Sequence, residues 1–377
     1  MSINFSTLQG LTIPEGVVTQ ITDASGVVLW TSSKPVVLEV AKQTLTTYAG
    51  ETSYADESFV LLDIFPKNAN STVRVTYGDL TKTLTFSGTN SQQVYFGTFN
   101  GVVDETETPS SGTLTIEGGY GTFVAGSYQS NSKGTINICG CITNVIDWGT
   151  VSSVSAGMFE NCASLALASL PDRITYIGTT AFKGCTNLAL TSLPSGITSI
   201  GSYAFYGCTN ITLSELPSGI TSIGSYAFYG CTNLALTSLP SGITSIGSYA
   251  FSSCSGLTNI TLPSGITSIG SYAFSSCSGL TNITLPSGLT SIGEATFYQC
   301  SGITSIDLPS ALVSIGMNAF WYCTSLVSVT FGNTVGWYVT ETVDAETGIN
   351  LDVSNATTNA TYLRNENYRT YYWYRAT

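Results

Sequence analysis

Nine of the ten cysteines recur at a fixed step of 23 residues, so the thiol is the first group in this chain to examine for chemistry. Cysteines form disulfides, bind zinc, or pack as small apolar side chains. Equivalent positions in stacked repeats have parallel Cβ vectors, which do not point at each other as a disulfide requires. We therefore expect buried free thiols. The ladder consists of Cys139, Cys162, Cys185, Cys208, Cys231, Cys254, Cys277, Cys300 and Cys323.

Two segments are candidates for metal binding. Cys139 and Cys141 are a close pair, but no second pair and no histidine completes a zinc site. The loop with Asp104, Glu105 and Glu107 could hold calcium, and the simpler interpretation is a solvated acidic loop. We expect no bound metal and no cofactor.

Enzymatic chemistry has little support in the residue types. The chain has no histidine, which is the commonest general base. Hydrolysis of a glycan would need two carboxylates about 5–10 Å apart. The acidic residues of the central region fall in different repeats, with no pairing evident. They are Asp172, Glu215, Glu294 and Asp307. The chain is therefore predicted to be non-enzymatic.

Aromatic and hydroxyl side chains keep the same step and are the candidates for binding. A first aromatic strip consists of Tyr203, Tyr226, Tyr249 and Tyr272. A second strip consists of Tyr206, Tyr229, Tyr298 and Trp321. A strand surface offers Thr258, Asn259 and Thr261, with Thr281, Asn282 and Thr284 one repeat later. Sugars bind to aromatic faces and to hydroxyl and amide groups without charge. The alternatives are rings that pack on neighbouring coils and a solvated strand face.

Composition excludes several classes of partner. Charged residues make up 9% of the chain, against roughly 25% in typical domains. The net charge is −12, and no basic patch suited to nucleic acid is present. The sequence contains no run of about 18 apolar residues, so we expect no membrane-spanning helix. The segment MSINFSTLQG has neither a basic nor an apolar signal region, so we expect no secretory signal.

The elements that must position these residues follow from the repeat itself. A period in this range indicates a solenoid, in which each coil buries its apolar side chains against its neighbours. The unit LPSGITSIGSYAFYGCTNLALTS contains two short strands, a Pro-Ser-Gly turn and a predicted short helical turn, SYAFYGC. A phenylalanine precedes each of the last eight cysteines by three residues. This ladder consists of Phe159, Phe182, Phe205, Phe228, Phe251, Phe274, Phe297 and Phe320.

The repeats divide into two blocks of four. Apolar residues fall at positions 1, 3 and 6 of heptamers such as LALTSLP, and at 1, 4 and 6 of heptamers such as LTNITLP. Because side chains of a strand alternate, a one-residue move changes which of them face inward. We infer a local bulge or bend in one block relative to the other. The alternative is that Leu190 or Thr191 adjusts without a visible kink.

The predicted fold is mainly β, with four parts. Residues 1–33 form a small β unit with a DASG turn, and residues 34–135 form an immunoglobulin-like β-sandwich of short strands. Residues 136–331 form the solenoid. Residues 332–377 form a cap, in which VGWYVTET and INLDV pair as a hairpin and Asn355 or Thr358 caps a short helix.

The recurring pattern LPxxLxxIGxxAFxxC, as in ITSIGSYAFSSC, resembles the BspA-like class of leucine-rich repeat over roughly half of the chain. That resemblance implies a curved right-handed solenoid and a role in binding host cells, matrix or other microbes. The segments LTIPEGVVTQITDASGVVLW and TNATYLRNENYRTYYWYR are similar to the ends of structural proteins of tailed phages of gut bacteria.

Together these resemblances imply a fibre-like virion protein. Its N-terminal region would contact other virion proteins, and its repeats would bind a glycan or protein of the host surface. A homo-oligomer is expected. The alternative is an adhesin or interaction scaffold on a bacterial cell surface.

Overall fold

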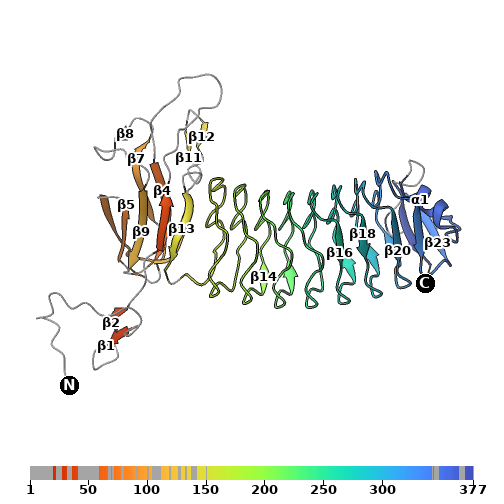
Figure 1. Cartoon of the computed structure of the whole chain (residues 1–377), viewed down its shortest axis with the longest axis horizontal. Helices are drawn as coiled ribbons and strands as arrows, with labels where there is room; N and C mark the ends of the chain where they lie inside the picture. Colours follow the sequence, from red (N-terminus) through yellow and green to blue (C-terminus); the bar gives the residue numbers. More distant parts are fainter. Residues whose placement is uncertain are drawn as a thin grey trace, which may run out of the picture.

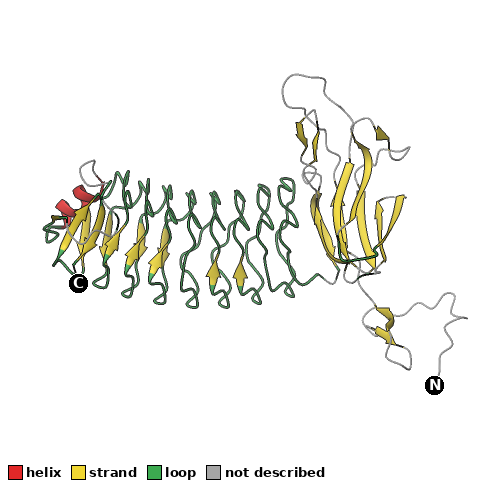
Figure 2. Ribbon diagram, turned by 180° about the vertical axis from the view of Figure 1, so that it is seen from behind, coloured by secondary structure: helices red, strands yellow, loops and turns green. Residues whose placement is uncertain are grey.

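The computed structural model confirms a mainly β chain that contains a solenoid with a 23-residue repeat (Figures 1 and 2). It describes residues 20–22, 28–31, 36–40, 59–66, 69, 72–77, 80–90, 92–99, 102–103, 112–118, 120–125, 129–131, 134–136, 142–149, 151–341, 343, 348–364 and 370–376. The acidic loop with Asp104, Glu105 and Glu107, and the pair Cys139 and Cys141, lie outside these residues.

The N-terminal β unit is an antiparallel pair. Strands β1 (Gln20–Thr22) and β2 (Val28–Thr31) pair with Gln20 opposite Thr31 and Ile21 opposite Trp30. The predicted turn DASG connects them in sequence. The two strands expected on either side of that turn are therefore confirmed.

Two antiparallel sheets follow, as the alternating short runs predict. One has the order β10-β4-β7-β8 and the other has the order β13-β3-β9-β5-β6. Alternation is visible in β5, where Val73 and Val75 are buried and Arg74 is exposed. The strands of the sheets are β3 (Val36–Val40), β4 (Phe59–Pro66), β5 (Thr72–Tyr77), β6 (Leu80–Thr85), β7 (Gln92–Phe99), β8 (Val102–Val103), β9 (Gly112–Gly118), β10 (Tyr120–Ala125) and β13 (Ile142–Trp148). A further hairpin pairs β11 (Gln129–Asn131) with β12 (Gly134–Ile136).

Strand β13 belongs both to a sheet and to the array. On one side it pairs antiparallel with β3, with Val145 opposite Leu38. On the other side, the carbonyl of Thr143 accepts a hydrogen bond of 2.9 Å from the amide of Ala166 in the first coil. The ring of Trp148 packs edge-on against Phe159, with ring centroids 5.8 Å apart. The expected boundary after residue 135 thus precedes a strand that closes one end of the solenoid core.

Each coil contributes one short strand to a parallel ladder that is in register. The ladder begins with the bridge between Val154 and Ile177, and from there isoleucine pairs with isoleucine 23 residues on, as far as the pair of Ile292 and Ile315. The strands are β14 (Ser199–Ile200), β15 (Ser222–Ile223), β17 (Ser268–Ile269), β19 (Ser291–Ile292) and β21 (Ser314–Ile315). This pairing keeps equivalent side chains of successive coils side by side.

The segment predicted as a short helical turn is a chain of tight turns. The amides of Ala204 and Tyr206 bond to carbonyls three residues back, at 3.3 and 3.2 Å. The amides that alternate with these donate to the next coil instead, as when Phe205 N donates to Ala227 O at 2.8 Å. Tyr203 has a φ of 58°, which a right-handed helix does not contain. Alternate amides therefore bind each coil to its neighbour.

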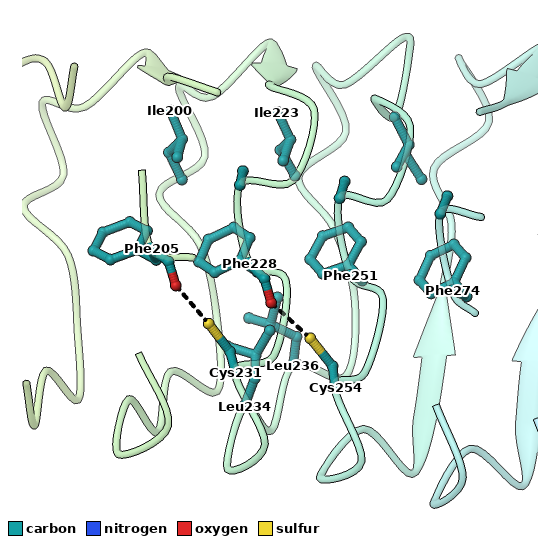
Figure 3. Packing of buried hydrophobic residues seen from close by; sticks show 14 of the residues in the cluster. Ile200, Phe205, Ile223, Phe228, Cys231, Leu234, Leu236, Phe251, Cys254 and Phe274 are labelled. Carbon is teal, nitrogen blue, oxygen red and sulfur yellow. Dashed lines mark hydrogen bonds between the residues drawn. The ribbon is translucent and has the colours of Figure 1, made fainter. Parts of the chain in front are cut away.

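The phenylalanine and cysteine ladders form the core of the array (Figure 3). Successive phenylalanine rings stack with centroids 5.3–5.8 Å apart. The thiol of Cys231 donates to the carbonyl of Phe205 at 3.1 Å, and Cys254 donates to Phe228 at 3.0 Å. The predicted free thiols are confirmed from Cys162 to Cys323. Burial raises the pKa of the Cys277 thiol to about 12, so these groups stay protonated.

The structure confirms that different positions of the heptamer face inward in the two blocks, and the bulge or bend inferred from this stays a prediction. In the first block Leu188 and Leu190 are buried, whereas in the second block Leu257 and Ile260 are buried. The second block alone forms regular strands here, namely β16 (Asn259–Thr261), β18 (Asn282–Thr284), β20 (Ser305–Leu308) and β22 (Ser328–Phe331). Three of the four coils of the second block have a glycine two residues after the cysteine, and the fourth has Ser325 there. A Cβ on Gly256 would lie 2.6 Å from the carbonyl oxygen of Thr232, so an asparagine like Asn233 does not fit there.

A C-terminal cap closes the other end. Strand β23 (Trp337–Thr340) pairs with β24 (Ile349–Asn350), which confirms the predicted hairpin. Helix α1 (Ala356–Arg364) begins after Asn355, whose Oδ1 accepts a hydrogen bond of 2.9 Å from Thr358 N. Strand β25 (Tyr372–Arg375) pairs antiparallel with both β21 and β23, and Trp373 is buried. The described part of the aromatic tail is therefore a docked cap.

Candidate binding surface

The acidic and cysteine side chains of the described residues can be examined for a metal site. Within them, no group of three or more cysteine or acidic side chains could hold a metal ion. Glu294 accepts a hydrogen bond from the hydroxyl of Tyr272, and Asp307 accepts one from Thr330. Among the helices that the structure describes, none has the length and apolar character to cross a membrane. The residues predicted for binding lie on the surfaces of the coils.

The first predicted strip is a continuous stack of tyrosine rings. Ring centroids are 4.6 Å apart for Tyr203 and Tyr226, 4.5 Å for Tyr226 and Tyr249, and 4.6 Å for Tyr249 and Tyr272. The rings are parallel within 6°. All four side chains are half-buried. They thus pack on one another and still present their outer edges to solvent.

The second predicted strip is broken. Tyr206 and Tyr229 stack at 4.7 Å, but the next two coils have Ser252 and Ser275 at that position. Tyr298 and Trp321 lie beyond the gap and form a separate cluster, in which Trp321 also stacks on Tyr322 at 4.6 Å. The expected single strip of Tyr206, Tyr229, Tyr298 and Trp321 is therefore two groups, because serine supplies no ring to bridge them.

The two tyrosine stacks meet in one patch. Tyr203 lies 5.9 Å from Tyr206, and Tyr226 lies 5.9 Å from Tyr229, with tilted rings. We call these side chains the tyrosine patch. It consists of Tyr203, Tyr206, Tyr226, Tyr229, Tyr249 and Tyr272. The patch crosses four successive coils.

The backbone fixes the direction of these rings. Tyr203, Tyr226, Tyr249 and Tyr272 have φ angles of 58–59°, in the left-handed region that bulky residues seldom adopt. The bonds between coils hold this conformation, since Tyr226 N donates to Ser248 O at 2.9 Å. Partial burial and the neighbouring phenols raise the pKa of Tyr226. Burial and the bond to Glu294 raise the pKa of Tyr272 to about 12, so the phenols stay neutral and can donate hydrogen bonds.

The strand surface predicted for binding is exposed and regular. Asn259 pairs in register with Asn282, and Thr261 pairs with Thr284. Some of its hydroxyls already have partners in the array, because Thr281 donates to the carbonyl of Thr258 at 3.0 Å. The structure thus places Thr258, Asn259 and Thr261 on a polar face on which hydroxyls also join the coils.

The structure decides between the two interpretations of the first tyrosine strip, because its rings pack on neighbouring coils and their faces are covered. A ring inside the stack has a neighbour on each side at about van der Waals separation, so its edge and hydroxyl remain for a ligand. The sequence signal was the unbroken recurrence of tyrosine at one position in four successive repeats. The sequence also contains the signal for the break in the second strip, because Ser252 and Ser275 occupy the position of Tyr206 and Tyr229.

One family model matches the chain, and several solved structures are similar to parts of it. Residues 152–256 and 245–344 match the family described as the BspA type leucine rich repeat region, in six copies. A leucine-rich repeat protein from Bacteroides ovatus is 27% identical, with a TM-score of 0.45 and coverage of 57% of this chain and 68% of that chain. A leucine-rich repeat protein from T. pallidum is 27% identical, with a TM-score of 0.38 and coverage of 53% and 87%.

The pneumococcal vaccine antigen PcpA is 20% identical, with a TM-score of 0.32 and coverage of 50% of this chain and 61% of that chain. No curated protein sequence matches the chain. The family match spans just over half of the residues, through the same coils that carry the phenylalanine, cysteine and tyrosine ladders. The chain therefore belongs to the BspA type leucine-rich repeat family.

Proposed function

We propose that this protein is a non-enzymatic recognition protein whose tyrosine patch binds a protein on a cell surface. The observation that supports this most is the stacking of four half-buried tyrosines across four coils. Tyrosine is enriched in protein interfaces because it buries a large area and loses little conformational freedom. Stacking orders these rings before any partner arrives, which lowers the entropy lost on binding.

A protein partner fits the patch better than a glycan. Sugars stack on open aromatic faces, and the faces of Tyr226 and Tyr249 are covered by neighbouring rings. Ring edges and hydroxyls remain, and these suit the peptide groups and apolar side chains of a protein. Residues 184–293 contain one charged side chain, Glu215. Binding should therefore depend little on salt concentration.

The repeats themselves supply conservative substitutions to test this surface. The double variant Tyr226→Thr/Tyr229→Ser copies Thr180 and Ser252, which occupy the equivalent positions in other coils. We expect it to bind cells of a panel of gut bacteria at least about tenfold more weakly, which corresponds to about 1.4 kcal/mol. Flow cytometry of the labelled full chain measures this. Treating the cells with protease should abolish binding, and oxidising their glycans with periodate should not.

A matched control alters the strand surface. Asn259→Ser/Asn282→Ser copies Ser305 at the equivalent position of the next coil and should leave binding unchanged. Loss of binding in this control, with full binding in the tyrosine variant, would move the site to the strand face. Loss after periodate alone would replace the protein partner by a glycan.

We also propose that the protein is displayed on a tailed phage particle. Its N-terminal region would contact other virion proteins, and several copies would assemble. The similarity of both ends of the chain to phage structural proteins supports this, and the alternative is a bacterial surface adhesin. Immunogold electron microscopy of lysate, with antibody against residues 146–377, should label tailed particles. Label on cell envelopes with bare particles would favour the adhesin.

A further inference from the structure

Four pairs of tyrosines in adjacent coils are positioned for coupling to one another. The stacked pairs have centroids 4.5–4.7 Å apart and planes within 6° of parallel. Equivalent ring carbons of each pair therefore lie side by side. The tilted pairs within a coil are farther apart, at 5.9 Å. Each ring is half-buried, so its edge is open to an oxidant.

Near the patch, tyrosine is the oxidisable side chain that is most accessible to an oxidant. Residues 159–316 contain no tryptophan and no methionine. The thiols of the coils that carry the patch are buried, and those of Cys208, Cys231, Cys254 and Cys277 each donate a hydrogen bond to a phenylalanine carbonyl. Burial keeps them in the thiol form, which reacts more slowly than thiolate. A radical formed on the patch therefore has other tyrosines as its nearest reaction partners.

We propose that the tyrosine patch is a site of oxidative cross-linking, which joins adjacent coils through dityrosine. The co-reactant is hydrogen peroxide used by a haem peroxidase. Two tyrosines each lose one electron and one phenolic proton. The two phenoxyl radicals then form one carbon–carbon bond between ring carbons ortho to the oxygens. Each of these carbons gives up its hydrogen as each oxygen regains one. Hydrogen peroxide takes up the two electrons and two protons and becomes two waters.

The fold decides which tyrosines couple. Coupling needs two radicals together, and a neighbour held in contact raises the effective concentration far above that of a second molecule. Links should therefore join residues 23 positions apart, such as Tyr203 with Tyr226. Such links would tie successive coils together covalently. This modification is independent of the proposed recognition role.

The test uses the full chain at low concentration with peroxidase and hydrogen peroxide. Cleavage after Glu160, Glu215 and Glu294 yields peptides 161–215 and 216–294. These separate Tyr203 and Tyr206 from the rest of the patch. We expect mass spectrometry of the monomer fraction to find the two peptides joined, at the sum of their masses less two hydrogen atoms. The blue fluorescence of dityrosine should accompany them.

Two variants separate the patch from general oxidation. Tyr203→Phe/Tyr206→Phe keeps the rings and removes the phenols, so the joined peptides should disappear while the melting curve is retained. Tyr176→Phe removes an exposed tyrosine of the same peptide and should leave the joined peptides at the wild-type amount. Joined peptides in the double variant would overturn the proposal. Equal yield from protein oxidised in denaturant, or links found only in dimers, would do the same.

Discussion

Phe228→Ala should lower the free energy of unfolding by about 3–5 kcal/mol, as truncation of a buried aromatic ring does elsewhere. Phe228 is fully buried, and its ring stacks on Phe205 at 5.3 Å and on Phe251 at 5.5 Å. Its loss leaves a cavity with rings on two sides. Because neighbours contact only neighbours in a solenoid, the cavity weakens the interfaces with both adjacent coils. Thermal and urea unfolding followed by circular dichroism measures the effect.

Two control variants test whether the loss of stability comes from the buried ring. Phe228→Leu keeps most of the apolar volume and should cost clearly less than alanine. Tyr176→Ala removes an aromatic ring that is 42% exposed and should change the melting temperature little. A melting curve of Phe228→Ala that coincides with wild type would contradict the description of the phenylalanine ladder as the core.

The period of the sequence was enough to predict the core and the order of elements. A residue that returns every 23 positions must occupy the same place in every coil, so Phe228 and Cys231 had to be buried or exposed together with their equivalents. Because phenylalanine and cysteine are apolar, burial was the expected outcome for both ladders. Local signals also predicted the hairpin of β23 and β24 and a capped helix at the C-terminal end, and of the two candidate caps Asn355 is the one that precedes α1.

The orientation of the tyrosine side chains could not be predicted in the same way. Period shows that Tyr203 and Tyr226 are equivalent, but the direction of a ring depends on backbone angles. The left-handed φ of these residues arises from bonds between coils, which are long-range contacts. A helical turn would have placed the rings differently. The sequence left open whether the rings pack on neighbouring coils, and the structure shows that their faces are covered.

The shared strand β13 shows a second limit of pattern reasoning. ITNVIDW does not alternate: its buried residues Ile142, Val145 and Trp148 are three apart, and its pairing with β3 shifts register twice. The segment also lies where the array begins. It pairs with β3 as a strand of the sheet, and it accepts a hydrogen bond from Ala166 of the first coil as part of the array. A domain boundary placed at one position in the sequence assigns β13 to a single domain, although one edge of this strand pairs with the sheet and the other contacts the first coil.

Gly224→Ala should lower the free energy of unfolding by about 3 kcal/mol, the upper end for overpacking in a close-packed core. A Cβ at this position would lie 2.5 Å from the amide nitrogen of Ser202 and 2.8 Å from the carbonyl carbon of Gly201. Both are backbone atoms of the preceding coil, which cannot swing aside. The glycine therefore permits the close approach of coils, and the same crowding recurs at Gly247.

Gly219 in the same coil provides the matched control. A Cβ there would lie 3.5 Å from the carbonyl oxygen of Ile197, which is an ordinary contact. Gly219→Ala should therefore change stability by less than about 1 kcal/mol, and the sign can be favourable because alanine restricts the unfolded chain. Unfolding midpoints of the two variants, measured side by side, separate crowding from glycine content. Equal midpoints would mean that the spacing of the coils adapts, and that Gly224 is not what sets it.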